Sequence, residues 1–295
     1  MKCIAFPKRS VCEIHSRRPT NRSSGHNKAS RLLQMQKPRL FAALLNSDVR
    51  CNAATFVIHM SEYGQLELMS MHLDALYILN EANGRILAVN QWDGGSVPRF
   101  HLGRTRQGVA YRFRDDIPAV LENRLKYWCD DEPLQTDICG YPVHLDKYIE
   151  LLEDQQPVNS IWQGPVYRFR VRPEMTSIET TLLNKDNRHL LETCLSDWLP
   201  DVGHRWPFIA SIADNHAVSV CASVRVTERA HEAGLETFES YRKRGFAVAA
   251  VSAWANAVFD QGAIPFYSTS WDNVRSQNVA LSLELDFVGT DFHVG

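Results

Sequence analysis

A short basic segment in the last quarter of the chain has the composition of an anion-binding turn. Arg242, Lys243 and Arg244 come directly before Gly245, and an alanine-rich apolar run with the composition of a helix follows. Backbone N–H groups at a helix N-terminus point toward a bound anion, and glycine lets that anion come close to the backbone. The segment therefore predicts a site for phosphate groups, and its three cations suit a pyrophosphate.

Secondary-structure signals on both sides place this turn between a strand and a helix. Residues 230–238 have the composition of a strand, and a helix, a short strand and a second helix are expected after Gly245. Asn273 is a typical residue for the start of that second helix. A last strand is expected over residues 287–294. Further upstream, a helix capped near Asn184 is expected before a strand hairpin.

The preceding part of the chain predicts a compact α+β unit. Asn83-Gly84 between two apolar runs is a strong hairpin signal, and we expect strands on both sides of it, the first beginning near Leu73. Two helices are expected, one capped by Asp116 and the other over residues 145–152.

The length of 295 residues fits one large domain or two of ordinary size. We expect three parts. Residues 1–59 form a basic extension that is disordered or foreign to the natural protein, residues 60–172 form an N-terminal α+β accessory domain, and residues 173–295 form the domain with the anion-binding turn.

Basic residues gather at the start of the chain. Residues 1–40 carry ten Lys/Arg and one acidic residue, whereas the remainder carries 22 basic and 33 acidic residues. The segment fits an organellar presequence, a nucleic-acid-binding arm, or sequence upstream of a true start at Met60, Met69 or Met71. We favour the last interpretation, because a basic tail without a motif is weak evidence for a function. The acidic remainder repels phosphate backbones, so we expect no nucleic-acid partner.

Cysteine usage and hydropathy exclude several protein classes. Seven cysteines, an odd number with no C-x-x-C pair, indicate reduced thiols and a cytoplasmic protein. No His/Cys pair has the spacing of metal ligands, so we expect no metal site. No apolar run is long enough to span a bilayer, and we expect no membrane partner.

The order of motifs in the C-terminal part resembles the GNAT superfamily of acyl-CoA-dependent N-acyltransferases. Three motifs over residues 177–294 carry the resemblance: an R-x-x-G-x-A signature between a strand and a helix, an S-x-x-N-x-x-S opening of the last helix, and a Leu-Asp-Phe end at 285–287, where relatives usually have Leu-Gly-Phe. The residues of the first two motifs are Arg242, Gly245, Ala247, Ser270, Asn273 and Ser276.

The resemblance implies an α+β fold, with a GNAT-like mixed sheet flanked by helices in residues 173–295, the GNAT acetyltransferase domain. Residues 60–172 resemble the N-terminal accessory domain of a two-part subgroup, and one interpretation is that they are a degenerate GNAT-like copy. The donor implied is acetyl-CoA. The cofactor-binding residues implied are Thr237, Phe238, Arg242, Lys243, Arg244, Gly245, Phe246, Ala247, Asn273 and Ser276. The alternative is that Gly245 serves only a tight turn and Asn273 only caps a helix.

Direct attack of an amine on a thioester requires a neutral amine, a polarised carbonyl and a proton for the departing thiolate. Glu232 and Glu236 lie on the strand that faces the substrate in relatives, and in a regular strand they share one face. Either is a candidate catalytic base, directly or through water, with His231 as a third. A strand N–H near Phe238 is expected to polarise the carbonyl. Ala280 stands where many relatives have the tyrosine that protonates the thiolate.

Together these features predict a cytoplasmic N-acetyltransferase that transfers an acetyl group to a primary amine. A small-molecule acceptor is expected, because an accessory unit of this size can wall off the acceptor cleft. The alternative is a catalytically silent acyl-CoA-binding or regulatory module, which Ala280 and Asp286 favour because both depart from the pattern of relatives.

Overall fold

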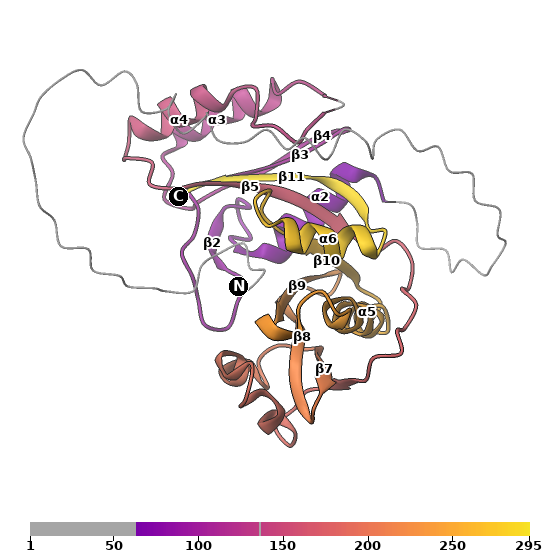
Figure 1. Ribbon diagram of the computed structural model, residues 1–295. Coiled ribbons are helices and arrows are strands. Elements are labelled where there is room, and N and C mark those ends of the chain that lie inside the picture. Colours follow the sequence, from indigo (N-terminus) through magenta and orange to yellow (C-terminus); the bar gives the residue numbers. More distant parts are fainter. Residues whose placement is uncertain (1–62, 136) are drawn as a thin grey trace, which may run out of the picture. The chain divides into compact units, whose positions relative to one another are not determined.

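The computed structural model describes residues 63–135 and 137–295 (Figure 1), and the predictions for residues 1–59 lie outside these residues. The α-helices are α2 (Gln65–Leu76), α3 (Ala119–Asp130), α4 (Leu145–Glu153), α5 (Phe246–Phe259) and α6 (Val274–Ser282). The strands are β1 (Tyr77–Leu79), β2 (Ile86–Val89), β3 (Phe100–Thr105), β4 (Gly108–Phe113), β5 (Ile161–Arg168), β6 (Thr180–Leu182), β7 (Phe208–Ala213), β8 (His216–Val226), β9 (Ala230–Thr237), β10 (Ile264–Ser268) and β11 (Asp286–Val294). Short 3₁₀ helices are η2 (Arg188–Leu191), η3 (Ser196–Asp201) and η4 (Glu239–Tyr241).

Nine of the strands in the described residues form one sheet, in the order β4-β3-β11-β5-β10-β9-β8-β7-β6. Neighbouring strands in it pair antiparallel, except β9 and β10, which pair parallel. The expected α+β class and mixed sheet are therefore confirmed. Strand β5 precedes the expected boundary at residues 172/173 in the chain, yet it lies between β10 and β11, which follow that boundary. The sheet is thus continuous across it.

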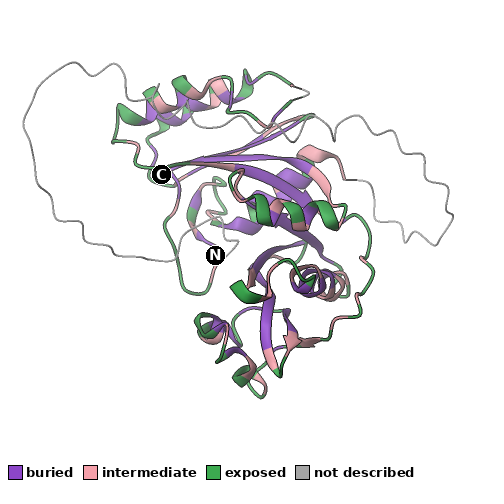
Figure 2. Cartoon of the chain, viewed as in Figure 1, coloured by how far each residue is buried: buried purple, intermediate pink, exposed green. Residues whose placement is uncertain are grey.

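Helices cover both faces of this sheet (Figures 1 and 2). Helix α5 packs on β8, β9 and β10, and α3 and α4 pack on β3, β4 and β11. Helix α2 packs on the opposite face of the central strands, and η2 and η3 cover the same face of β7 and β8. Since strand side chains alternate between faces, each central strand buries side chains on both sides.

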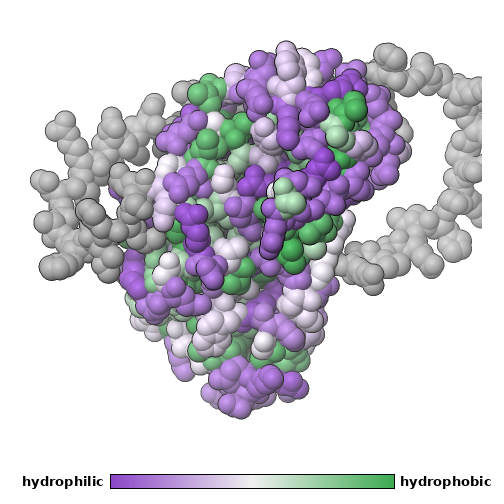
Figure 3. All heavy atoms as spheres, turned by 180° about the vertical axis from the view of Figure 1, so that it is seen from behind, coloured by the Kyte–Doolittle hydropathy of each residue, from purple (hydrophilic) through white to green (hydrophobic). Residues whose placement is uncertain are grey.

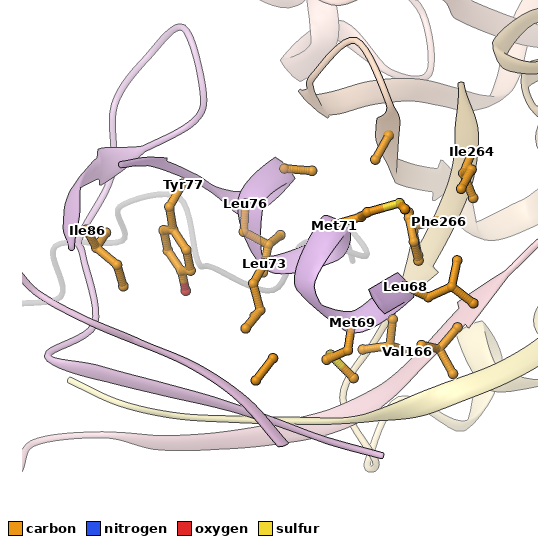
Figure 4. Packing of buried hydrophobic residues seen from close by; sticks show 14 residues of the cluster. Leu68, Met69, Met71, Leu73, Leu76, Tyr77, Ile86, Val166, Ile264 and Phe266 are labelled. Carbon is orange, nitrogen blue, oxygen red and sulfur yellow. The ribbon is translucent and has the colours of Figure 1, made fainter. Parts of the chain in front are cut away.

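Helix α2 is enclosed on almost all sides. Only Glu67 and Asp74, seven residues apart on one stripe, are exposed. Figure 4 shows Leu68 and Met71 beside Phe266 of β10, with Val166 of β5 nearby. The helix therefore joins the N-terminal part of the chain to the strands of the C-terminal part.

Two local expectations were wrong. The apolar residues from Leu73 to Leu76 form the last turn of helix α2 instead of the start of a strand, because they extend the buried surface that Leu68 to His72 begin. The turn at Gly84 is present, with φ 71°. The helix expected after Asn184 is replaced by η2 and η3. The side chain of Asn184 accepts the N–H of Asp186 at 2.7 Å, and Pro200 removes a donor within η3, which together favour short turns.

A smaller expectation, that Asp116 caps α3, was also wrong. The Asp116 carboxylate is 2.6 Å from Nε of Arg114, and α3 begins after Pro118 without a side-chain cap. Proline suits this position because it lacks the N–H that a helix start leaves unpaired.

The surface seen from behind in Figure 3 mixes hydrophobic with hydrophilic residues. No helix within the described residues is both long and apolar enough to cross a membrane. In the same residues, no group of three or more His, Cys, Asp or Glu side chains is arranged to hold a metal ion.

Candidate active site

Strands β9 and β10 part in the middle of the sheet. Their parallel pairing covers three positions and ends where Glu232 faces Phe266. Beyond that position β9 continues along β8 as far as Thr237, and β10 continues along β5 as far as Ser268. We call residues 233–237 of β9 and 267–268 of β10 the strand divergence. A ladder that ends here leaves one edge of each strand without a partner strand.

Hydrogen bonding shows which groups of β9 face this divergence. The N–H of Phe238 donates to the carbonyl of Val218 at 2.9 Å, so it points toward β8. In an antiparallel ladder such residues alternate with residues whose N–H and C=O point the other way. The N–H groups of Leu235 and Thr237 therefore point toward the divergence. The expected N–H donor near Phe238 thus has candidates in these two residues, while that of Phe238 itself is used within the sheet.

The end of β9 leads directly into the basic turn. Gly245 is the N-cap of α5 with φ 85°, and Lys243 also has a positive φ, 60°. Among the described residues, no hydrogen bond engages the N–H groups of Arg244, Gly245 or Phe246. Ser211 of β7 donates to the carbonyl of Phe246 at 2.9 Å and holds the helix start against the sheet. The turn thus presents unpaired N–H groups at a helix N-terminus, the geometry of an anion site.

The three cations of the turn have different surroundings. Arg242 donates from Nε to the carbonyl of Thr237 at 3.2 Å and pairs with Glu239, so it braces the turn against β9. Arg244 lies over the rings of Tyr241 and Phe246, at 5.0 and 5.4 Å. Lys243 and Arg244 are exposed. The two exposed cations are the ones that can reach an anion held at the turn.

The start of α6 contains the other two expected cofactor-binding residues. Asn273 accepts the N–H of Ser276 at 3.3 Å and caps the helix. Ser276 is buried, with Oγ 2.5 Å from the hydroxyl of Tyr267. Tyr267 therefore points from β10 into the first turn of α6, and Ala280 lies buried in the same cluster.

Glu232 joins the two strands where their pairing ends. Its Oε1 accepts the N–H of Ser268 at 2.7 Å and the hydroxyl of the same residue at 2.6 Å. Its Oε2 lies 3.1 Å from Nδ1 of His72, on helix α2. Glu232 is only 4% exposed. The carboxylate therefore replaces a backbone partner for β10 and has both oxygens occupied.

Glu236 lies on the same strand face, farther along the divergence. Its Oε2 accepts the indole N–H of Trp198 at 2.7 Å, and the residue is half-buried. Gly234 lies between the two glutamates, and a side chain there would collide with Val224 and crowd Trp198. Glycine keeps this face open to the indole, so Glu236 is the more accessible of the two candidate bases.

His231 points to the other face, beneath α5. Its Nδ1 is 2.8 Å from the hydroxyl oxygen of Ser223, which also accepts the indole N–H of Trp254 at 3.0 Å. Burial lowers the pKa of His231 to about 4. The third candidate base is thus a buried neutral side chain on the face opposite both glutamates.

Two buried histidines, His231 and His293, lead us to expect a loss of stability in mild acid. Burial lowers the pKa of His231 to about 4 and, with the nearby His101, that of His293 to about 3. Below about pH 6.5 the unfolded chain takes up protons at both residues while the folded chain does not, so the free energy of unfolding falls by roughly 1.4 kcal/mol per pH unit for each histidine between pH 6.5 and 4.

The measurement is the slope of unfolding free energy against pH, from urea titrations of wild type and His231→Gln. Glutamine keeps a partner for Ser223 but does not titrate. The slope of the variant should be shallower by about one proton, or roughly 1.4 kcal/mol per pH unit. Equal slopes would show that His231 already titrates normally in the folded protein.

Several residues of this site carry no sequence signal. His72 and Trp198 lie far from the motifs in the chain, and Ser268 belongs to no predicted site. Their roles follow from packing of α2 and η3 on the strand face that bears the glutamates.

Comparison with known proteins places this region in a family. Residues 209–290 match a family model described as GNAT acetyltransferase. No curated protein matches the chain.

Solved structures with partial similarity include three bacterial proteins. A protein from Novosphingobium aromaticivorans, described as an acetyltransferase of the GNAT family, has 12% identity and a TM-score of 0.41, over 46% of this chain and 65% of its own. A GNAT-family acetyltransferase from Colwellia psychrerythraea has 11% identity and a TM-score of 0.40, over 63% of this chain and 75% of its own. A GCN5-related N-acetyltransferase-like protein from Streptococcus suis has 17% identity and a TM-score of 0.40, over 68% and 85%.

The residues that match the family model run from β7 to β11. They include the diverging strands β9 and β10, the basic turn and the N-terminus of α5. Because sequence match and geometry coincide on these elements, we identify residues 209–290 of this chain as a GNAT acetyltransferase region.

Proposed function

We propose that this chain transfers the acetyl group of acetyl-CoA to the primary amine of a small molecule. The observation that carries the proposal is the continuity of two features. The strand divergence, with the N–H groups of Leu235 and Thr237, leads within a few residues to the unpaired N–H groups of the turn at Gly245. An elongated substrate with a thioester at one end and a pyrophosphate nearer the other suits that continuous edge.

The turn and the divergence have separate tasks in this proposal. The N–H groups from Arg244 to Ala247, with the cations of Lys243 and Arg244, would hold the pyrophosphate. An N–H of Leu235 or Thr237 would donate to the thioester carbonyl as negative charge develops on its oxygen. The other expected cofactor residues, Asn273 and Ser276, would support the site through the start of α6.

Acyl transfer forms a C–N bond and breaks the C–S bond, and the amine loses a proton. Glu236, half-buried and on the divergence, is our candidate for accepting that proton, directly or through water. Glu232 has both oxygens engaged and would act mainly by holding β9 and β10 together. The departing thiolate needs little assistance, because a coenzyme thiol is much more acidic than an alcohol.

A small acceptor is supported by what covers the glutamates. The strand face that bears Glu232 and Glu236 lies beneath α2 and beside Trp198 of η3, which leaves less access than an open sheet would. The described cysteines Cys129, Cys139, Cys194 and Cys221 are free, which supports a cytoplasmic location.

A catalytically silent acyl-CoA-binding module is the second candidate. It is favoured by the hydroxyl of Tyr267, which is occupied by Ser276, and by the alanine at 280. With the Tyr267 hydroxyl occupied, proton return to the thiolate would depend on another group or on water.

Thiol release distinguishes the two candidates. The full chain is incubated with acetyl-CoA or octanoyl-CoA and with small primary amines or lysine-containing peptides, and free thiol is measured. We expect release with acetyl-CoA that depends on a small amine. Binding of acetyl-CoA without release with any acceptor would favour the silent module, and release with peptides alone would contradict the small acceptor.

A further inference from the structure

Buried polar side chains form a continuous chain from the strand divergence into the N-terminal part of the sheet. Its members, all buried, are Glu232 on β9, His72 on α2, Asp291 on β11, His101 on β3 and Tyr77 on β1. His72 lies between two carboxylates, with Nδ1 3.1 Å from Glu232 and Nε2 2.7 Å from Asp291. The second oxygen of Asp291 is 3.3 Å from Nε2 of His101, whose Nδ1 is 2.6 Å from the Tyr77 hydroxyl.

The two carboxylates beside His72 favour a charged ring. A neutral imidazole has one N–H, whereas the imidazolium has two and carries a positive charge, so only the charged ring has an N–H facing each carboxylate. Burial by itself lowers the pKa of His72, but Asp291 and Glu232 outweigh it and raise the pKa to about 10. His72 is therefore the cation that accompanies two buried carboxylates, which would otherwise repel each other.

Other titratable groups face the same cluster. His293 of β11 stands beside His101, with ring centroids 5.5 Å apart. Arg225 of β8 is buried near Glu232 and Tyr77; burial lowers its pKa to about 10, so it stays charged at neutral pH. His72 is the side chain among these with direct contacts to both Glu232 and Asp291.

The contact between Glu232 and Ser268 links this cluster to the site. The N–H of Thr269 donates to the carbonyl of Pro165, and the N–H of Phe169 donates to the carbonyl of Pro265, so both bonds join β10 to β5. N–H directions alternate along a strand, and the N–H of Ser268 therefore points the other way, toward β9. No residue of β9 pairs with β10 at that level, and the Glu232 side chain accepts this N–H instead. Where β10 lies relative to β9 thus depends on where Glu232 is held.

We propose that His72 is a positioning residue for acyl transfer. Its imidazolium holds Glu232 against Ser268 and so sets where β9 and β10 part to take the thioester arm of acyl-CoA. This inference rests on the proposed function, because it assumes that the divergence is the thioester site. It makes helix α2, outside the matched family region, a component of that site.

The test compares His72→Gln with wild type in the full chain. Glutamine keeps a polar side chain but lacks the charge and the second donor toward the carboxylates. We expect weaker acetyl-CoA binding and a kcat/KM lower by roughly 10²-fold, because misplacing reacting groups by about 1 Å costs this much. The acid limb of the pH profile should move to higher pH, because two buried carboxylates without a cation between them favour uptake of a proton.

Tyr77→Phe is the matched control. It removes a buried hydroxyl at the other end of the same chain and leaves His72, Glu232 and Asp291 in place. Its acetyl-CoA affinity and pH profile should match wild type. A purely structural polar chain would respond to both substitutions in stability, but neither would shift the pH profile.

A double mutant separates positioning from general loss of folding. If His72 acts through Glu232, His72→Gln combined with Glu232→Gln should bind acetyl-CoA as weakly as Glu232→Gln alone. The double mutant can still be measured if His72→Gln alone does not fold, because it contains one buried carboxylate fewer than the single mutant. Additive losses, or wild-type affinity and pH profile in His72→Gln, would overturn the proposal. If wild type binds acetyl-CoA but acetylates no amine, the proposed function fails while the affinity comparison still decides the role of His72.

Discussion

Replacing Glu236 with glutamine is expected to lower kcat by roughly 10²–10⁴-fold near neutral pH, the usual contribution of a general base. The substitution preserves shape, and the amide oxygen can still accept the indole N–H of Trp198. Affinity for acetyl-CoA should therefore stay unchanged. Activity should partly return at high pH, where more of the acceptor amine is already neutral. Steady-state kinetics with a small primary amine across a pH series is the measurement.

Glu232→Gln is the matched comparison on the same strand face. Its carboxylate has both oxygens engaged with Ser268 and His72, so we expect a loss that includes weaker acetyl-CoA binding. A fall in kcat alone in this variant, with Glu236→Gln unaffected, would assign the base to Glu232. If both variants turn over like wild type, β9 supplies no carboxylate base and water becomes the better candidate.

Gly245→Glu is expected to abolish acetyl-CoA binding while the protein stays folded. The φ of 85° disfavours any side chain, and a β-carbon there would lie 3.2 Å from Ile178, so a moderate loss of stability is expected. The added carboxylate would stand where the pyrophosphate is proposed to bind. A ligand that binds only the folded state stabilises it, by about 2.7 kcal/mol at a hundredfold excess over Kd, and this stabilisation raises the melting temperature. The variant should show no such rise with acetyl-CoA.

Gly262→Glu provides the control for backbone strain and charge. Gly262 also has a positive φ, 75°, and has open space around its Cα. It follows the C-terminus of α5, whereas Gly245 caps the N-terminus of the same helix. This variant should therefore keep the full rise in melting temperature with acetyl-CoA. A normal rise in Gly245→Glu would remove the basic turn from the cofactor site.

Local signals sufficed where a few neighbouring residues decide the backbone. Asp214 and Asn215 have φ values of 50° and 62° and join β7 to β8, as a two-residue hairpin turn requires. Gly245 takes the left-handed conformation at a helix start, and Asn273 caps α6. For the same reason the basic turn and the strand before it could be predicted from sequence. Side-chain alternation also placed Glu232 and Glu236 on one strand face.

Packing between distant residues decided what sequence could not. The apolar residues that begin at Leu73 fit either a strand or a helix. They are helical in the structure because α2 is buried on several sides. Strand β5 lies between β10 and β11 because it pairs with strands that follow it by about a hundred residues or more in the chain.

The chemistry of the two glutamates was decided in the same way. In the sequence the two are equivalent, since both are glutamates on the same face of one predicted strand. In the structure, Glu232 is buried between Ser268 and His72, whereas Glu236 is half-buried beside Trp198. Residue type and local backbone were enough to predict the candidate bases and the candidate anion-binding turn from the sequence. Tertiary structure alone decided which carboxylate is accessible, because helices α2 and η3 reach the strand from distant parts of the chain.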